Sequence, residues 1–131
     1  LPTDGVMYGS SKTKMTDIGD GASNTIIVGE RPPDAKFAWG WTFWGWFDSS
    51  MPVKVYARPD SFTYSACAVP GTFGPGNTND ICHGLHYWSL HEGGAHFAFA
   101  DGSVRFISYS VGPDLLPKLA TRNCGEAVDI P

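Results

Sequence analysis

Asp101-Gly102 is the feature that most constrains how this chain can fold. Asp-Gly between alternating apolar residues is a strong signal for a two-residue type I′ turn, which needs positive φ at both central positions. Pairing the flanking residues around that turn predicts two distinct faces of a hairpin over residues 95–108, since side chains alternate along a strand. One face carries Phe97, Phe99, Val104 and Phe106, and the other carries Ala98, Ala100, Ser103 and Arg105.

The length and composition favour one small domain that is rich in strands and loops. A chain of 131 residues is enough for a single domain, residues 1–131. Its 16 glycines, 10 prolines and 14% aromatic content favour strands and turns over a helical bundle. We expect a mainly β fold with an antiparallel sheet and long irregular loops. Residues 25–29 form a predicted strand, and a short helix is predicted near 113–121, where Leu115, Leu116 and Leu119 make an apolar stripe.

Charge and hydropathy exclude two broad classes of function. The net charge is −4 and no cluster of Lys and Arg appears, which argues against nucleic-acid binding. No run of about 18 apolar residues occurs, so no membrane span is expected in this chain. The chain begins with Leu1-Pro2 and lacks an initiating Met, which suggests a processed or truncated protein.

Three cysteines allow one disulfide. Cys67 and Cys82 flank a loop rich in Gly, Pro and Asn, and a bridge between them would remove on the order of 3 kcal/mol of unfolded-state entropy. Such a bridge suits an oxidising compartment. The alternative is three buried free thiols, and in either case Cys124 has no assigned partner.

The aromatic stretch over residues 37–47 is the most distinctive apolar segment outside the hairpin. Four of the five tryptophans of the chain lie between positions 39 and 46. They form either the core of a helix-poor domain or an exposed platform for a helix, for other subunits or for sugar rings. The residues that we expect to face a partner or ligand are Trp44, Trp46 and Tyr87.

His91 and Asp101 invite an acid–base interpretation that simple geometry disfavours. If residues 95–100 are extended they span about 20 Å, at roughly 3.3 Å per residue. Only a fold-back at Gly93-Gly94 would join the two side chains, so we predict that they do not touch. Asp101 is then a turn residue. His91 is expected to fix the sharp turn at Gly93-Gly94 through a hydrogen bond to the backbone.

Other chemistry-bearing residues do not form a recognised motif. No G-x-S-x-G segment is present, and Glu30 and Glu92 show no sign of pairing, so an enzyme is not expected. Zinc-type ligands lie at Cys82, His83, His86, His91 and His96. They lack a C-x2-C or H-E-x-x-H spacing, so we expect these histidines to be structural or surface groups rather than a zinc site. Oxygen ligands that could hold calcium lie at Asp17, Asp20 and Asn24, with ordinary Asx turns as the alternative.

Several segments together carry a family resemblance. They are His91 followed after nine residues by Asp101-Gly102, with Phe73–Asn77, Trp88–Gly94, Phe99–Phe106, Asp20–Thr25 and Val28–Glu30. From about Asp17 to Ile130 the chain resembles the prepilin-type processing-associated H-X9-DG domain, found in secreted bacterial proteins, which has no established biochemical function. Cys124 stands where the family is expected to have Gly.

The resemblance implies an architecture and a role. Members of this family typically begin with a type IV pilin-like leader and a long hydrophobic helix on which the antiparallel sheet packs. The chain is therefore similar to the C-terminal globular part of such proteins, α+β if the helix is counted. The leading hypothesis is a non-enzymatic subunit, without a cofactor, that assembles with itself or related subunits at the cell surface or in the periplasm. The alternative is an extracellular module that binds solutes or glycans through its aromatic face.

Overall fold

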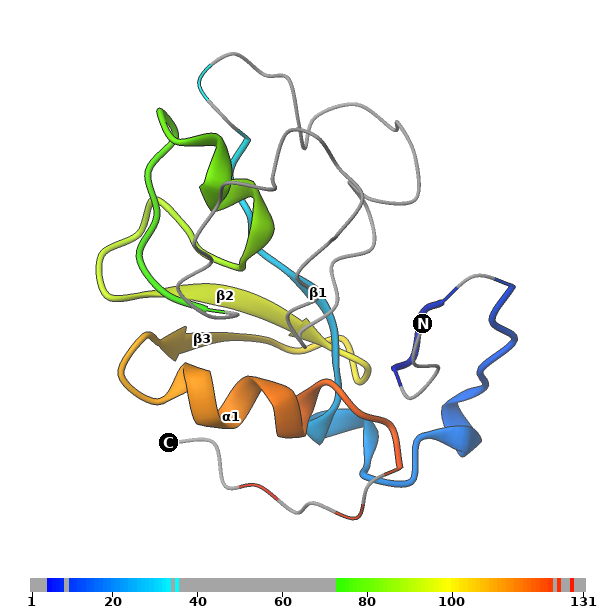
Figure 1. Cartoon of the computed structure of the whole chain (residues 1–131). Helices are drawn as coiled ribbons and strands as arrows, with labels where there is room; N and C mark the ends of the chain where they lie inside the picture. Colours follow the sequence, from blue (N-terminus) through cyan, green and yellow to red (C-terminus); the bar gives the residue numbers. More distant parts are fainter. Residues whose placement is uncertain are drawn as a thin grey trace.

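Within the residues that the structure describes, the chain folds around a small antiparallel sheet with one short α-helix (Figure 1). The computed structural model describes residues 5–8, 10–33, 35, 73–123, 125 and 128. In chain order the elements are η1 (Met15–Asp17), η2 (Ala22–Asn24), β1 (Ile26–Gly29), η3 (Ile81–Leu85), β2 (Gly94–Phe99), β3 (Val104–Ser108) and α1 (Gly112–Leu119). The strand order is β1-β2-β3. The predicted mainly β class, the hairpin near 95–108 and the short helix are confirmed.

Strand β1 corresponds to the predicted β-branched run and pairs antiparallel with β2. An irregularity between Ile26 and Val28 breaks the simple alternation, and Val28 ends up 55% exposed. Thr25, just before the strand, is fully buried and its Oγ1 donates to the carbonyl of Gly21. This hydrogen bond between Thr25 and Gly21 orders the segment before β1 and fixes where the strand begins.

The hairpin turn differs from the predicted two-residue type. Gly102 has φ +84°, whereas Asp101 is not among the residues with positive φ, so a type I′ turn is excluded. The N–H of Gly102 donates to the carbonyl of Phe99, and the N–H of Phe99 donates to the carbonyl of Ser103. These bonds define a three-residue loop in which a left-handed glycine follows a tight turn.

The longer loop shifts the register by one residue, and the predicted faces are therefore wrong for β3. The structure pairs Ala98 with Val104, Phe97 with Arg105, His96 with Phe106 and Ala95 with Ile107. Because side chains alternate along a strand, a slip of one residue moves every side chain to the other face. Val104 and Phe106 consequently point away from the core, and Ile107 takes the inner position.

Contacts to the chain before β1 explain why this register is adopted. The N–H of Ala100 donates to the carbonyl of Thr25 at 2.8 Å, and that of Asp101 donates to the carbonyl of Ala22 at 3.0 Å. Both bonds come from the three-residue loop and require its particular backbone shape. The turn is therefore shaped by η2 and the start of β1 as well as by its own sequence.

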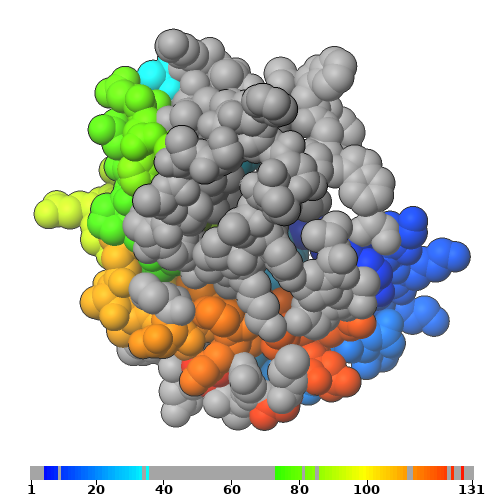
Figure 2. Space-filling view, viewed as in Figure 1, coloured from blue at the N-terminus to red at the C-terminus, as the bar shows by residue number. Residues whose placement is uncertain are grey.

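The core lies between the inner face of the sheet and α1. Its buried members are Phe73, Ala95, Phe97, Phe99, Ile107, Leu115, Leu116 and Leu119. Helix α1 supplies the predicted leucine stripe, and it runs beside β3 in Figure 1. Figure 2, drawn from the same side, shows α1 along the lower flank and the segment from residue 73 to 90 along the upper left. Within the described residues, no helix is both long and apolar enough to cross a bilayer.

Candidate functional site

The two halves of the H-X9-DG pattern lie at opposite ends of β2. Asp101 follows the strand, and its Oδ1 accepts hydrogen bonds from the N–H of Ser103 at 2.9 Å and from its hydroxyl at 2.6 Å. These bonds, the side-chain one first, lower the pKa of Asp101 below its ordinary value. Asp101 thus acts on its own turn, where its carboxylate holds the residue that leads into β3.

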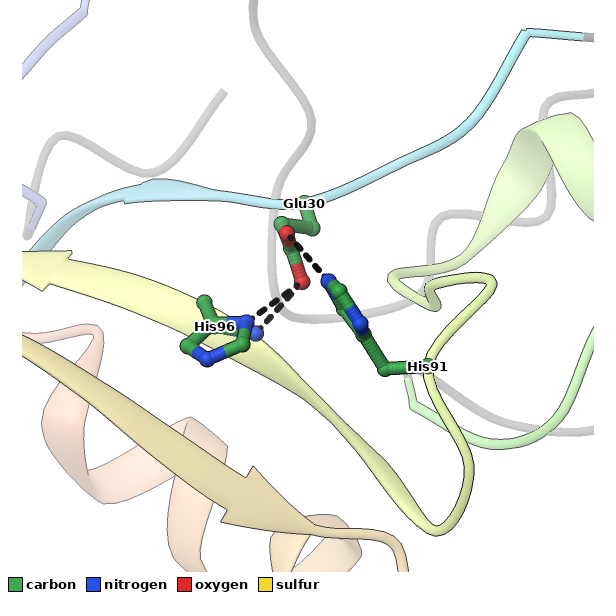
Figure 3. Close-up of side chains that lie close together, drawn as sticks. All are labelled: Glu30, His91 and His96. Carbon is green, nitrogen blue, oxygen red and sulfur yellow. Dashed lines mark hydrogen bonds and ion pairs between the residues drawn. The ribbon is translucent and has the colours of Figure 1, made fainter.

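His91 precedes the same strand and meets two residues that the sequence did not bring together. Its Nε2 lies 3.5 Å from Oε1 of Glu30, and Nδ1 of His96 lies 3.4 Å from Oε2 of the same carboxylate. The two imidazole rings are 4.9 Å apart between centroids and nearly perpendicular, at 83°. Figure 3 shows both rings directed at the carboxylate, which lies between them. We call these three residues the Glu-His-His cluster.

The sheet ladder positions Glu30. The N–H of Glu30 donates to the carbonyl of His96, and its own carbonyl accepts from the N–H of Trp88, both at 3.2 Å. Its side chain then returns to the same neighbour, since Oε2 accepts from the N–H of His96 at 2.6 Å. A carboxylate that accepts a backbone N–H in this way has its orientation fixed before any ligand arrives.

A compact turn positions His91. The N–H of His91 donates to Oγ of Ser89 at 2.9 Å, and that hydroxyl donates to the carbonyl of Gly94 at 2.6 Å. Gly93 has φ +80°, a conformation that favours glycine. A Cβ on Gly94 would lie 2.1 Å from the carbonyl oxygen of Ile107, so that position has room for glycine alone.

The structure thus contains the predicted sharp turn at Gly93-Gly94, but the side chain that stabilises it is Ser89 rather than His91. Ser89 makes the side-chain hydrogen bonds that hold the turn, whereas the imidazole of His91 is directed at Glu30. Glu30 and His96 were not predicted from the sequence as partners of His91. The signal that could have found them is alternation: His96 faces the open side of β2, and β1 ends one residue before Glu30.

The cluster is open to solvent and carries three groups that bind protons or metals. The side chains of His91, His96 and Glu30 are 56%, 40% and 36% exposed. Within the described parts of the chain, one group of three or more His, Cys, Asp or Glu side chains could hold a metal ion. It is this cluster, and its ligand atoms all lie within 4.8 Å of one another. The arrangement can therefore hold a cation or share protons between a carboxylate and two imidazoles.

The remaining histidines, His83 and His86, form a separate pair in which His86 is buried and His83 is partly exposed. His86 is 1% exposed, and its Nε2 lies 2.6 Å from Nδ1 of His83, while its own Nδ1 lies 3.1 Å from the carbonyl of Tyr87. Burial lowers the pKa of His86, and the neighbouring His83 lowers it further. Trp88 donates from Nε1 to the carbonyl of His83, so this pair is part of the packing under η3.

The residues proposed for calcium, Asp17, Asp20 and Asn24, are engaged in hydrogen bonds within the chain. Asp17 Oδ2 accepts from the N–H of Lys14 at 2.8 Å, and Nδ2 of Asn24 donates to the carbonyl of Asp20 at 3.2 Å. Asp20 Oδ1 also accepts from the N–H of Gly125 at 2.7 Å, which ties the chain after α1 to this loop. Calcium binding there stays a prediction.

The proposed aromatic surface is represented by one residue. Tyr87 is half-buried, its ring packs at 5.7 Å between centroids against Phe97, and burial raises its pKa to about 12. The structure places it at the edge of the core. Trp44 and Trp46 lie outside the described residues, as does Cys67, so the aromatic surface and the Cys67–Cys82 disulfide stay predictions.

Comparison with known proteins gives one result. A family model described as a protein of unknown function (DUF1559) matches residues 1–114. The chain belongs to this family. No curated protein and no solved structure matches it. The DUF1559 match supports the family resemblance in its broader form, and the pilin-like assignment stays a prediction.

Proposed function

We propose that this DUF1559 protein is a non-enzymatic, secreted, pilin-like structural subunit that assembles with copies of itself or with related subunits. The observation that carries the proposal is the exposed apolar face of the sheet. Val28, Val104 and Phe106 are 55%, 64% and 44% exposed, although all lie in or beside regular strands. Exposed apolar side chains that adjoin one another mark interaction surfaces more often than scattered ones do.

The strand register makes these side chains one continuous strip. Val28 of β1 pairs with Ala98 of β2, and Ala98 pairs with Val104 of β3, so three apolar residues lie in a row across the sheet. Phe106 stands two residues beyond Val104 on the same face. Directly paired side chains on one face lie about 4.5–5.5 Å apart, close enough to be covered together. We call these four residues the open strip.

Helix α1 already covers the inner face of the same sheet. This favours an assembly surface, rather than an incomplete core, as the explanation for the exposed apolar side chains on the outer face. Helix α1 and the inner side chains bury one another, with Phe97, Phe99 and Leu116 at 1% exposure or less. Among the described residues, the core therefore does not include the open strip. The resemblance to the H-X9-DG domain supplies a suitable partner, since the sheet in such proteins is expected to pack on a hydrophobic helix.

Electron microscopy of the native protein tests the proposal. We expect filaments or regular oligomers, because an apolar strip on every copy favours repeated contacts. A homogeneous monomer at high protein concentration, with no assembly on addition of related subunits, would contradict it. The competing role, a glycan-binding module, depends on Trp44 and Trp46. Specific binding on a glycan array by a monomeric protein would favour that role.

A further inference from the structure

We infer that the Glu-His-His cluster is a binding site for a divalent transition-metal ion, with Zn²⁺ as the foremost candidate. The inference does not rest on the proposed assembly role, because it is argued from the side chains at one end of β2, although His96 pairs with Phe106 of the open strip. Glu30, His91 and His96 supply one carboxylate oxygen and two imidazole nitrogens. Zn²⁺ is bound in proteins by these ligand types, and a site of two histidines and one glutamate leaves one coordination position open.

The spacing of the ligand atoms fits a metal better than it fits direct hydrogen bonds. A nitrogen–oxygen hydrogen bond is about 2.7–3.2 Å long. The two nitrogen–oxygen distances in the cluster are 3.5 Å and 3.4 Å. Ligands held about 2.0–2.2 Å from a tetrahedral ion lie about 3.3–3.6 Å from one another. One nitrogen of each imidazole therefore stands at this separation from an oxygen of the Glu30 carboxylate, and the ligand atoms of all three side chains lie within 4.8 Å of one another.

The cluster is also arranged before any metal arrives. The N–H of His96 holds Oε2 of Glu30 at 2.6 Å, and the hydroxyl of Ser89 holds the N–H of His91 at 2.9 Å. Hydrogen bonds that orient ligand groups strengthen metal sites, since less motion is lost on binding. One ion would join the end of β1, the turn before β2 and β2 itself.

The exposure of the cluster lets an ion enter from solvent. His91, the most exposed of the three at 56%, comes from the turn before β2, and that turn projects from the surface in Figure 2. Because three protein ligands leave one position of a tetrahedral site unfilled, water or a group from a neighbouring molecule would complete the site.

The pair formed by His83 and His86 offers an internal comparison. His83 and His86 approach to 2.6 Å between ring nitrogens, which is too close for two ligands of one ion. His86 is also 1% exposed. Both groups contain two histidines, so histidine content does not distinguish them as metal sites. The distances between ligand atoms and the exposure of the side chains favour the Glu-His-His cluster.

Isothermal titration calorimetry with Zn²⁺, together with thermal melts with and without the ion, tests the inference. We expect one ion per chain and a rise in melting temperature, since an ion that binds the folded state stabilises it. Glu30→Gln, His91→Ala and His96→Ala should each weaken binding by at least about 10-fold. Glu92→Gln, which removes a neighbouring exposed carboxylate, and His83→Ala, which removes a histidine elsewhere, should bind as the wild type does.

Several results would overturn the inference. They are no saturable binding by the wild type, undiminished binding by Glu30→Gln, or equal loss in His83→Ala. Glu30→Gln keeps an oxygen for the N–H of His96, so its fold should survive, and circular dichroism of each variant verifies this. Titration with Co²⁺ gives a second readout, because its visible absorption bands report tetrahedral coordination. Their presence in the wild type and absence in His96→Ala is expected, and bands that persist in His96→Ala would contradict the site.

Discussion

The two faces of the sheet are built from alternate residues of the same strands, yet they have opposite environments. On the inner face, Phe97 and Phe99 are at most 1% exposed and pack with Ile107 against α1. On the outer face, Val104 and Phe106 remain 64% and 44% exposed. Both faces of the sheet thus carry large apolar side chains. The inner face stabilises the fold, and the outer face is the surface from which we derive the proposed function.

Neighbouring residues of β3 give the largest expected difference between the faces. Ile107→Ala should lower the free energy of unfolding by about 2–5 kcal/mol, since it leaves a cavity beside Phe97. Phe106→Ala should cost less than about 1 kcal/mol, because its side chain is partly solvated. Urea unfolding of both variants measures this. If the two costs were reversed, the register and with it the assignment of faces would be wrong.

The glycine of the turn sets that register and gives the next largest effect. Gly102→Ala should cost about 1–2 kcal/mol, because φ is +84° and the space around a new Cβ is empty, which leaves backbone strain as the cause. Gly74→Ala is the matched control, since a Cβ there also meets nothing within 4 Å and no positive φ is involved. Equal unfolding free energies for the two variants would contradict the turn described here.

The buried His86 extends the comparison to pH. Burial lowers the pKa of His86 from 6.5, so the unfolded chain binds more protons than the folded one at and just below that pH. Stability from the neutral His86 is then complete above pH 6.5 and is lost as the pH falls below it. His86→Asn should reduce this acid sensitivity in thermal melts. Unchanged acid sensitivity in His86→Asn would show that other groups cause it.

The sequence predicted elements better than it predicted their relations. β1, the hairpin and α1 follow from local patterns: a β-branched run, alternation around Asp101-Gly102 and a leucine stripe. The register of the hairpin did not follow from a local pattern, because the hydrogen bond from Ala100 to the distant Thr25 favours the three-residue loop between β2 and β3. The cluster did not either, because Glu30 and His96 are 66 positions apart and meet only through strand pairing.

His91 shows how far a motif can be interpreted alone. Its spacing from Asp101 drew attention to the pair, and strand geometry correctly separated them. Its partner Glu30 directly follows the neighbouring strand β1, which is distant in the sequence, so no spacing rule applies. The three-residue site therefore needed the fold, although each of its members could be named as a metal ligand by type.

Sedimentation of the native protein and of a Val104→Ser/Phe106→Ser double variant tests the central claim most directly. The changes remove apolar surface from the open strip and should alter the free energy of unfolding little. Met15→Ser, which removes an equally exposed apolar side chain elsewhere, is the control. We predict that the native protein and the control sediment as assemblies and that the double variant sediments as a folded monomer. Undiminished assembly of the double variant would contradict the claim that the open strip joins the subunits.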